Sequence, residues 1–508
     1  MFENNELPQF PEPYWRASTE FQSFSKLTSD IEADVAIVGG GITGITTAYL
    51  LAKEGVKVAL IEAGSILNGT TGHTTAKITA QHDLIYDELI QKLGEEKANL
   101  YYKANDEALQ FIKNKVNEYK IDCDLTAEDA YIYTNSDDYI RKLENEYKAY
   151  ERLGINGEYV KSTPLPFETE AAIIMKQQAQ FHPLKFLNNL IPSIQNAGGL
   201  IYENTTAVDI EKADNPQVIT RDGHKITCKH VIICSHFPFY ANGLYFTRMY
   251  AERSYVLAAK TEVDFPGGMY ISAEQPTRSL RYTMMNGKKL VLIGGESHKT
   301  GQGISTIKHY EALQVFGDKY FGIKEIPYRW SAQDLITLDK VPYVGQITAN
   351  IPNIFVATGY RKWGMTNSVV AASLLRDTIM ERNNPYYDLY SPSRFNADPS
   401  VKNFFTLNLD VAKHLIEGKL EYAFRKPEDL VNGEGAVVNV NGKRAGAYKD
   451  EDGVVHIVDT TCTHLGCELE WNSGDCTWDC PCHGSRFSIK GDVIEGPAEK
   501  PLKRIDER

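Results

Sequence analysis

One segment near the start of the chain restricts the fold more than any other: "ADVAIVGGGITGITTAYLLAKEGVKVALIEAG", Ala33 to Gly64. It opens with an apolar, β-branched run typical of a buried strand, and a helical stretch then continues to Gly55. A second apolar run, Val56 to Ile61, ends at Glu62. This order predicts a strand–turn–helix–strand unit of a parallel α/β sheet.

Three glycines between the first strand and the helix fit the spacing G-x-G-x-x-G. Gly39 permits a tight turn, Gly41 lets the backbone approach a pyrophosphate, and Gly44 allows close contact between helix and strand. Free N–H groups at the start of a helix attract phosphate. Glu62 can accept hydrogen bonds from ribose hydroxyls. The segment therefore predicts a dinucleotide site, for FAD or NAD.

The position of this unit at the start of the chain favours FAD, and later segments agree. "KHVIICSHFP", from Lys229, predicts another buried strand, and "IPNIFVATGYRKWGMTNSVVAASLLRDTI", from Ile351, predicts a strand, a turn and a helix. Together with "NGTTGHTTAKIT", "FHPLKFLNNL" and "LITLDKVPYVG", these motifs resemble the D-amino-acid-oxidase-like (glycine and sarcosine oxidase-type) flavoproteins. The resemblance covers roughly residues 30 to 390.

This resemblance implies bound FAD and a flavin edge faced by the N-terminus of the last helix, where negative charge appears on reduction. It also implies an α/β Rossmann-type FAD-binding domain with an α+β substrate domain. The residues expected to bind the cofactor are Gly39, Gly41, Ile42, Thr43, Gly44, Glu62, Thr71, His73, Val208, Gly359, Gly364, Met365 and Thr366. Some relatives attach FAD covalently through a histidine at the place of His73; a hydrogen-bonding histidine is the alternative.

Four residues are candidates for the reaction itself. Arg361, Lys362 and Trp363 precede the last helix and are expected near the flavin, where a cation stabilises the reduced form; packing within the loop is the alternative. Asp334 falls near the position where carboxylate-binding relatives have Arg, so an acid there suggests an amine substrate. A role of Asp334 in capping the next turn is the alternative.

Two loops near the end of the chain, "CTHLGC" and "CPCHGS", hold a second group of reactive residues. Five of the eight cysteines lie between Cys462 and Cys482, so they indicate a local site rather than dispersed disulfides. Cys462 and His464 on one loop, with Cys480 and His483 on the other, suit either zinc or a two-iron cluster. The additional pair Cys467 and Cys482 favours the cluster, because a zinc site does not require it.

These loops, with the later "GPAEKPL", resemble the Rieske proteins of cytochrome bc complexes. The resemblance implies a [2Fe–2S] cluster held by Cys462, His464, Cys480 and His483, with a Cys467–Cys482 disulfide clipping the loops together. It further implies that Leu465 shields the cluster and that Ser485 donates a hydrogen bond to it. Phe487 stands where many high-potential relatives have Tyr, which predicts a potential below the upper Rieske limit of about +300 mV.

The chain is expected to form several domains, because 508 residues exceed one ordinary core. Residues 1–390 are assigned to the oxidoreductase, with FAD-binding parts at about 30–84, 166–240 and 336–390 and a substrate domain at about 85–165 and 241–335. A linker at 391–427 and a small all-β Rieske domain at 428–508 complete the prediction. Turn pairs such as Asn286-Gly287 and Asn441-Gly442 predict hairpins.

Composition excludes several kinds of partner. Net charge −13 argues against nucleic acid, and no apolar run is long enough to span a bilayer. The acidic, proline-containing N-terminus is unlike a signal peptide, so a cytoplasmic location is expected, where a disulfide is unusual.

The two predicted cofactors together suggest a function. A flavin takes two electrons as a hydride, whereas a [2Fe–2S] cluster carries one at a time, so the leading hypothesis is a dehydrogenase acting on a CH–NH bond. A small amine or amino acid would reduce the flavin, and the cluster would pass electrons to an external acceptor. Two alternatives remain: a ferredoxin-like reductase in which electrons run the other way, and a redox sensor without turnover.

Overall fold

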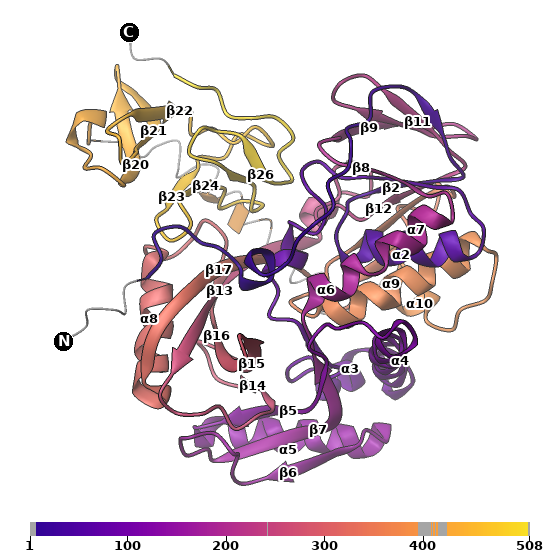
Figure 1. Ribbon diagram of the computed structural model, residues 1–508, viewed down its shortest axis with the longest axis vertical. Coiled ribbons are helices and arrows are strands. Elements are labelled where there is room, and N and C mark those ends of the chain that lie inside the picture. The colour runs from indigo at the N-terminus through magenta and orange to yellow at the C-terminus, as the bar shows by residue number, and fades with distance from the viewer. Residues whose placement is uncertain are drawn as a thin grey trace.

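The structure, a computed structural model, describes residues 7–240, 242–394, 408, 410–411, 413–414 and 424–505. Most of the predicted linker, 391–427, lies outside the described residues. The N-terminal part forms three sheets with helices around them, and the C-terminal β domain lies against one of these sheets (Figure 1). Within the described residues no helix is both long and apolar enough to cross a membrane.

A six-stranded sheet forms the centre of the predicted dinucleotide unit. Its order is β18 (Tyr343–Gln346), β19 (Ile354–Thr358), β12 (His230–Ile233), β2 (Val35–Val38), β3 (Val58–Ile61) and β8 (Leu200–Tyr202). All neighbours are parallel except the edge pair β18–β19, and β2 and β3 are buried on both faces, which explains their continuous apolar runs. The predicted α/β fold is confirmed.

Helices cover this sheet, and two of them are central to the site. Helix α2 (Ile42–Lys53) follows β2, and α9 (Gly364–Ile379) follows β19; the two pack against each other. Figure 1 shows them on the same face of the sheet. The remaining helices of this region are α1 (Tyr14–Ala17), α6 (Pro183–Asn188), α7 (Ile191–Asn196) and α10 (Tyr387–Tyr390).

A smaller sheet of four strands flanks the dinucleotide unit. Its order is β1 (Ile31–Glu32), β11 (Lys225–Thr227), β10 (Gln217–Thr220) and β9 (Ala207–Glu211). Val208, a predicted cofactor residue, lies in β9.

A nine-stranded sheet forms the second layer of the N-terminal part. Its order is β17 (Ile323–Thr337), β13 (Met249–Thr261), β16 (Lys288–Lys299), β15 (Arg278–Met285), β14 (Met269–Ser272), β5 (Thr126–Thr134), β7 (Ala171–Gln180) and β4 (Lys77–Ile78), and β6 (Gly157–Val160) pairs with β7. The helices that pack around it are α3 (Tyr86–Leu93), α4 (Glu95–Tyr119), α5 (Asp137–Leu153) and α8 (Ile307–Phe321). The predicted Asn286-Gly287 turn joins β15 to β16, with φ of 51° and 74°.

The C-terminal domain consists of short strands in two sheets, which confirms the predicted all-β class. One contains β20 (Gly435–Val440), β21 (Lys443–Lys449) and β22 (Val455–Val458). The other contains β23 (Glu470–Asn472), β24 (Thr477–Asp479), β25 (Arg486–Phe487) and β26 (Val493–Glu495). The loops that carry the Cys and His motifs precede β23 and β25.

Candidate functional site

The glycine turn after β2 has the shape that a dinucleotide site requires. Gly39 has φ of +112°, and a Cβ on it would meet the Cys234 carbonyl oxygen at 2.5 Å. A Cβ on Gly44 would collide with the Gly39 carbonyl oxygen, so helix and strand approach too closely for any side chain. Helix α2 then begins without a side-chain cap, and its Ile42 N–H donates to Thr71 Oγ1 at 2.9 Å. These residues fit the phosphates of FAD, whose binding the N-terminus of a helix favours.

Glu62 at the end of β3 holds the neighbouring backbone. Its two carboxylate oxygens accept from Gly40 N at 2.7 Å and from Gly64 N at 2.9 Å. Burial raises the pKa of Glu62, whereas these backbone donors lower it. The Glu62 carbonyl accepts from Thr205 N at 2.8 Å, which holds the segment leading into β9, the strand that contains Val208, against the end of β3.

The segment before α9 brings the other predicted residues to the same place. Tyr360 OH lies 3.0 Å from Thr43 Oγ1, so this segment contacts the first turn of α2. Gly359 has φ of +80°, and a Cβ there would collide with Thr337. Thr366 Oγ1 lies 3.1 Å from His82 Nε2, and Met365 is buried next to it.

Arg361 and Lys362 adopt left-handed backbone conformations in succession, with φ of +48° and +67°. Two adjacent non-glycine residues in this region are uncommon, and such strain concentrates at functional sites. Trp363 stacks on His82 with ring centroids 4.9 Å apart, and Arg361 Nη2 donates to the His82 carbonyl at 2.6 Å. Arg361 Nε is buried without a partner among the described residues. These contacts fix the turn, and the Arg361 Nε–H is the donor that they leave unpaired.

Asp334 lies beside this turn, where its carboxylate accepts the Lys362 backbone N–H. Its cross-strand neighbour is Glu252, whose Oε2 lies 3.1 Å from Lys362 Nζ. Burial raises the pKa of Asp334 to about 6. The sequence did not identify Glu252, since only the pairing of β13 with β17 brings it to Asp334.

His73 ends the short 3₁₀ helix Thr70–His73. Its Nδ1 donates to the Gly69 carbonyl at 2.9 Å, which leaves Nε2 as the unprotonated nitrogen of the neutral ring. Its own carbonyl accepts from Trp330 Nε1 at 2.8 Å, and burial lowers the pKa of the ring.

The four predicted cluster ligands lie together in the C-terminal domain. Cys462 and Cys480 are buried, their side chains hydrogen-bond to each other, and the His464 and His483 rings are 5.0 Å apart. Both Nδ1 atoms are buried and have no partner in the described part of the chain. Burial lowers the pKa of both rings, of His483 to about 4, and so favours the neutral imidazole. Two thiols and two orphaned ring nitrogens fit a Rieske cluster.

The two loops that carry these ligands have matching backbone hydrogen bonds. In one, Cys462 N donates to Cys467 O at 2.8 Å and Gly466 N to Cys462 O at 3.0 Å. In the other, Cys480 N donates to Ser485 O at 2.8 Å and Gly484 N to Cys480 O at 3.0 Å. Each loop therefore presents its thiol and imidazole from a closed turn.

The residues around the ligands follow the Rieske pattern. The predicted Cys467–Cys482 disulfide is present, and both sulfur atoms lie within 4.8 Å of the Cys480 sulfur. Ser485 hydrogen-bonds the Cys462 side chain and accepts from Ala498 N at 3.0 Å, which ties down the "GPAEKPL" loop. Phe487 is fully buried, and Leu465 is 51% exposed.

The C-terminal domain packs on one face of β13 and β17. Side chains alternate along a strand, and Ala251, Arg253, Arg329, Ser331 and Gln333 all point to this domain. Gln333 Nε2 donates to Gly484 O at 2.9 Å, and a Cβ on Gly484 would meet that of Ala251 at 2.5 Å. Figure 1 shows the domain, in yellow, beside these two strands.

A buried group of charges joins the two parts. Arg253 has no exposed surface and lies 3.6 Å from Asp475, 3.6 Å from Asp479 and 3.2 Å from Glu495. Arg486 of the C-terminal domain pairs with the same three acids. These cations lower the pKa of Asp475 and of Glu495 despite their burial.

The histidine side of the cluster site faces the N-terminal part. Phe246, in the 3₁₀ helix Tyr245–Thr247, lies edge-on to His464 at 5.8 Å and to His483 at 5.7 Å between ring centroids. An aromatic side chain of the chain itself therefore packs against both imidazoles.

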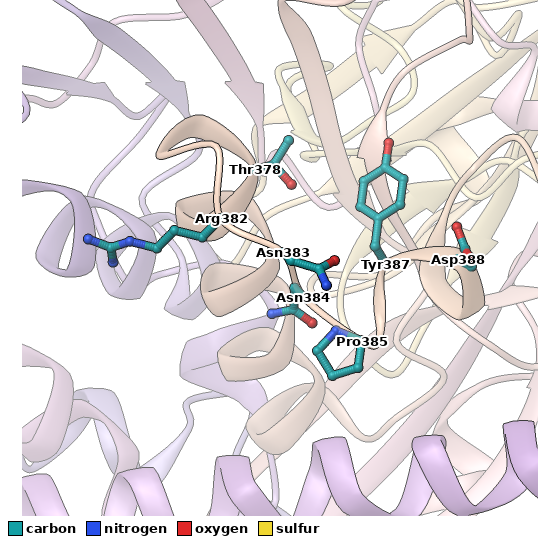
Figure 2. Close-up of a pocket in the computed structure, with 7 residues that line it drawn as sticks. All are labelled: Thr378, Arg382, Asn383, Asn384, Pro385, Tyr387 and Asp388. Atoms are coloured by element: carbon teal, nitrogen blue, oxygen red, sulfur yellow. The ribbon is translucent and has the colours of Figure 1, made fainter.

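A surface hollow lies at the far end of α9 (Figure 2). Its lining residues are Thr378, Arg382, Asn383, Asn384, Pro385, Tyr387 and Asp388. The helix has 16 residues and is about 24 Å long, so the hollow is remote from the predicted flavin edge at Gly364.

Known proteins resemble both parts of the chain. The DAO family, described as FAD dependent oxidoreductase, matches residues 34–378, and the Rieske [2Fe-2S] domain matches residues 421–506. A Bacillus subtilis (strain 168) protein named as a Rieske 2Fe-2S iron-sulfur protein, YhfW, is 54% identical over 98% of both chains. Gamma-glutamylputrescine oxidoreductase of Escherichia coli (strain K12) is 23% identical over 72% of this chain and 88% of its own.

Among solved structures, glycine oxidase from Geobacillus kaustophilus superposes with a TM-score of 0.60 at 19% identity. The match covers 72% of this chain and 99% of that one, and it supports the fold of the N-terminal part. The predicted cofactors follow from the two families: FAD in the N-terminal part and a [2Fe–2S] cluster in the C-terminal domain. The chain belongs to the DAO family of FAD-dependent oxidoreductases and carries a Rieske [2Fe–2S] domain at its C-terminal end.

Proposed function

We propose that the protein oxidises a small amine or amino acid and passes the electrons through its own Rieske cluster to an external one-electron acceptor. The observation that carries this proposal is the use of both faces of β13 and β17. Gln333 and Arg253 on one face hold the cluster-binding domain, while Asp334 and Glu252 on the other lie beside the turn that leads into α9. Residues 333 and 334 are consecutive in β17 and point to opposite faces, so a single sheet separates the two sides.

The reaction balances without a further cofactor. Loss of a C–H and an N–H hydrogen from an amine releases two electrons and two protons and leaves an imine, which water hydrolyses. When bound, FAD accepts the hydride and the [2Fe–2S] cluster carries electrons singly, so each substrate reduces two equivalents of a one-electron acceptor.

The residues beside the turn support an amine as the substrate. Lys362 neutralises Glu252, and the Asp334 carboxylate then remains for a substrate ammonium group. An ammonium group beside the Asp334 carboxylate is stabilised by the opposite charge. Arg361 and the N-terminus of α9 would stabilise the negative charge that reduction brings to the flavin, and Trp363, held by its stack on His82, would shape the wall of the site.

An anaerobic screen of amines, amino acids and NADH, with flavin and cluster absorbance recorded together, tests the proposal. A substrate is expected to bleach the flavin first and the cluster next. A Cys480→Ser variant, which lacks a cluster ligand, is the control: its flavin should still bleach. Flavin reduction with a permanently oxidised cluster would contradict internal transfer, bleaching by NADH would indicate the reverse direction, and no bleaching at all would indicate a sensor.

The finer assignments are part of the same proposal. They are the predicted domain boundaries, the cofactor residues and cluster ligands named from the sequence, and a cytoplasmic location. The acceptor is expected to be a small electron carrier, since simple oxidases of this family reduce oxygen without a Rieske domain.

A further inference from the structure

Gln333 lies at the interface between the N-terminal part and the C-terminal domain. It is 1% exposed, and its side chain is almost fully hydrogen-bonded: Nε2 donates to Gly484 O at 2.9 Å. Its Oε1 accepts from Thr300 Oγ1 at 2.8 Å and from Arg253 Nη2 at 3.2 Å. A buried amide with this many partners has one orientation, because any rotation leaves polar atoms unpaired.

The backbone of Gln333 contacts the 3₁₀ helix that carries two of the predicted FAD-binding residues. The Gln333 carbonyl accepts from Thr70 Oγ1 at 3.3 Å, and Thr70 begins the 3₁₀ helix that contains Thr71 and His73. The His236 ring also hydrogen-bonds the Gln333 backbone. Two segments are named here for what they are predicted to bind: the cofactor loop is Thr70–His73, and the cluster loop is residues 480–485. Gln333 is hydrogen-bonded to the cofactor loop through its main chain and to the cluster loop through its side chain.

The partner of the side chain is the glycine between a cluster ligand and its supporting serine. Gly484 lies between His483 and Ser485, and it packs on Ala251 so closely that a Cβ would meet the Ala251 Cβ at 2.5 Å. Its carbonyl is the group that Gln333 holds. A shift of the Gln333 amide therefore moves the loop that presents His483.

We infer that Gln333 is a positioning residue for electron transfer between the two cofactor sites. It sets the distance between the cofactor loop and the cluster loop, and the atoms from Thr70 Oγ1 to Gly484 O form a continuous path of covalent and hydrogen bonds. The inference rests on the proposed internal electron flow. In each transfer one electron would pass from reduced flavin to oxidised cluster, and the external acceptor would reoxidise the cluster before the second transfer completes a turnover.

The test compares Gln333→Met with Gln302→Met. Methionine keeps the length of the side chain and removes its hydrogen bonds. Gln302 is the matched control, because its Nε2 also donates to the cluster loop, at Pro481 O and 3.1 Å, without contacting the cofactor loop. Thr70→Val is a second variant that breaks the path at its other end, should Gln333→Met fail to fold.

Stopped-flow absorbance should record flavin bleaching and cluster reduction separately, and the electron paramagnetic resonance spectrum should report the ligand set. Gln333→Met is expected to slow cluster reduction by up to about a hundredfold, because a misplacement of about 1 Å between reacting groups can cost this much. Flavin bleaching and the spectrum should stay as in the unaltered protein, Thr70→Val should slow the same step, and Gln302→Met should not.

Two results would overturn the inference. One is an unchanged rate of cluster reduction in both Gln333→Met and Thr70→Val. The other is an equal loss in Gln302→Met, which would mean that any loosening of the interface has the same effect. If the unaltered protein itself fails to reduce its cluster, the proposed internal electron flow is wrong instead.

Discussion

Replacing Arg253 by methionine is expected to weaken the packing of the Rieske domain on β13 and β17. The Arg253 side chain is fully buried, and three carboxylates lie within 3.6 Å of it. Removal of one partner from a buried ion pair costs about 3–5 kcal/mol, because the remaining charges are left unpaired. Arg486 still pairs with the same acids, so we expect the lower end, about 3 kcal/mol, or more than a hundredfold in the docking equilibrium.

Urea unfolding measures this effect when cluster circular dichroism and flavin fluorescence are followed in the same samples. The cluster transition should move to lower urea in Arg253→Met, and the flavin transition should move less. Arg504→Met is the control: Arg504 pairs with Asp492 at 3.1 Å, but both side chains are 61% exposed, so its loss should cost under about 1 kcal/mol. Adding Asp479→Asn to Arg253→Met should restore part of the stability, because it removes an unpaired charge. Coincident cluster transitions in Arg253→Met and the unaltered protein would mean that Arg253 does not hold the Rieske domain in place.

Three further predictions concern the acid response, the cofactor turn and the substrate residues. Acidification should weaken the interface, because the pKa values of Asp475 and Glu495 are lowered in the folded chain. Their contribution to stability is complete above the ordinary carboxyl range near pH 4 and is lost as the pH falls below it. A cluster transition in urea that does not depend on pH between about 3 and 6 would contradict this. Gly44→Ala should purify with its cluster but with little FAD, since the new Cβ collides with the Gly39 carbonyl, and a full complement of FAD by absorbance would disprove the clash. For an amine substrate, kcat/KM should rise as the pH passes about 6, where Asp334 ionises, and Asp334→Asn should abolish this rise. An identical pH profile in the variant would exclude Asp334 as a group that binds the substrate.

The sequence predicted those features whose determinants are adjacent in the chain. The turn at Gly39 to Gly44, the hairpin at Asn286-Gly287 and the two Cys–His loops depend on local backbone geometry and residue spacing, and all are present. The orphaned ring nitrogens of His464 and His483 fit the predicted cluster.

The residues that connect the two parts could not be predicted in this way. Glu252, Arg253 and Gln333 acquire their partners only through the register of β13 with β17, and Phe246 meets the cluster histidines only because the domains pack together. Asp334 accepts the Lys362 N–H in the structure, and both its contact with a substrate and its role in capping the next turn remain predictions.

Electron transfer from the flavin to the cluster is tested most simply by a single anaerobic turnover with less than one equivalent of substrate, frozen and examined by electron paramagnetic resonance. Internal electron transfer predicts the signal of a reduced Rieske cluster, with an intensity that follows the amount of substrate, and no such signal in Cys480→Ser. A reduced flavin beside a cluster that stays oxidised at all times would contradict it.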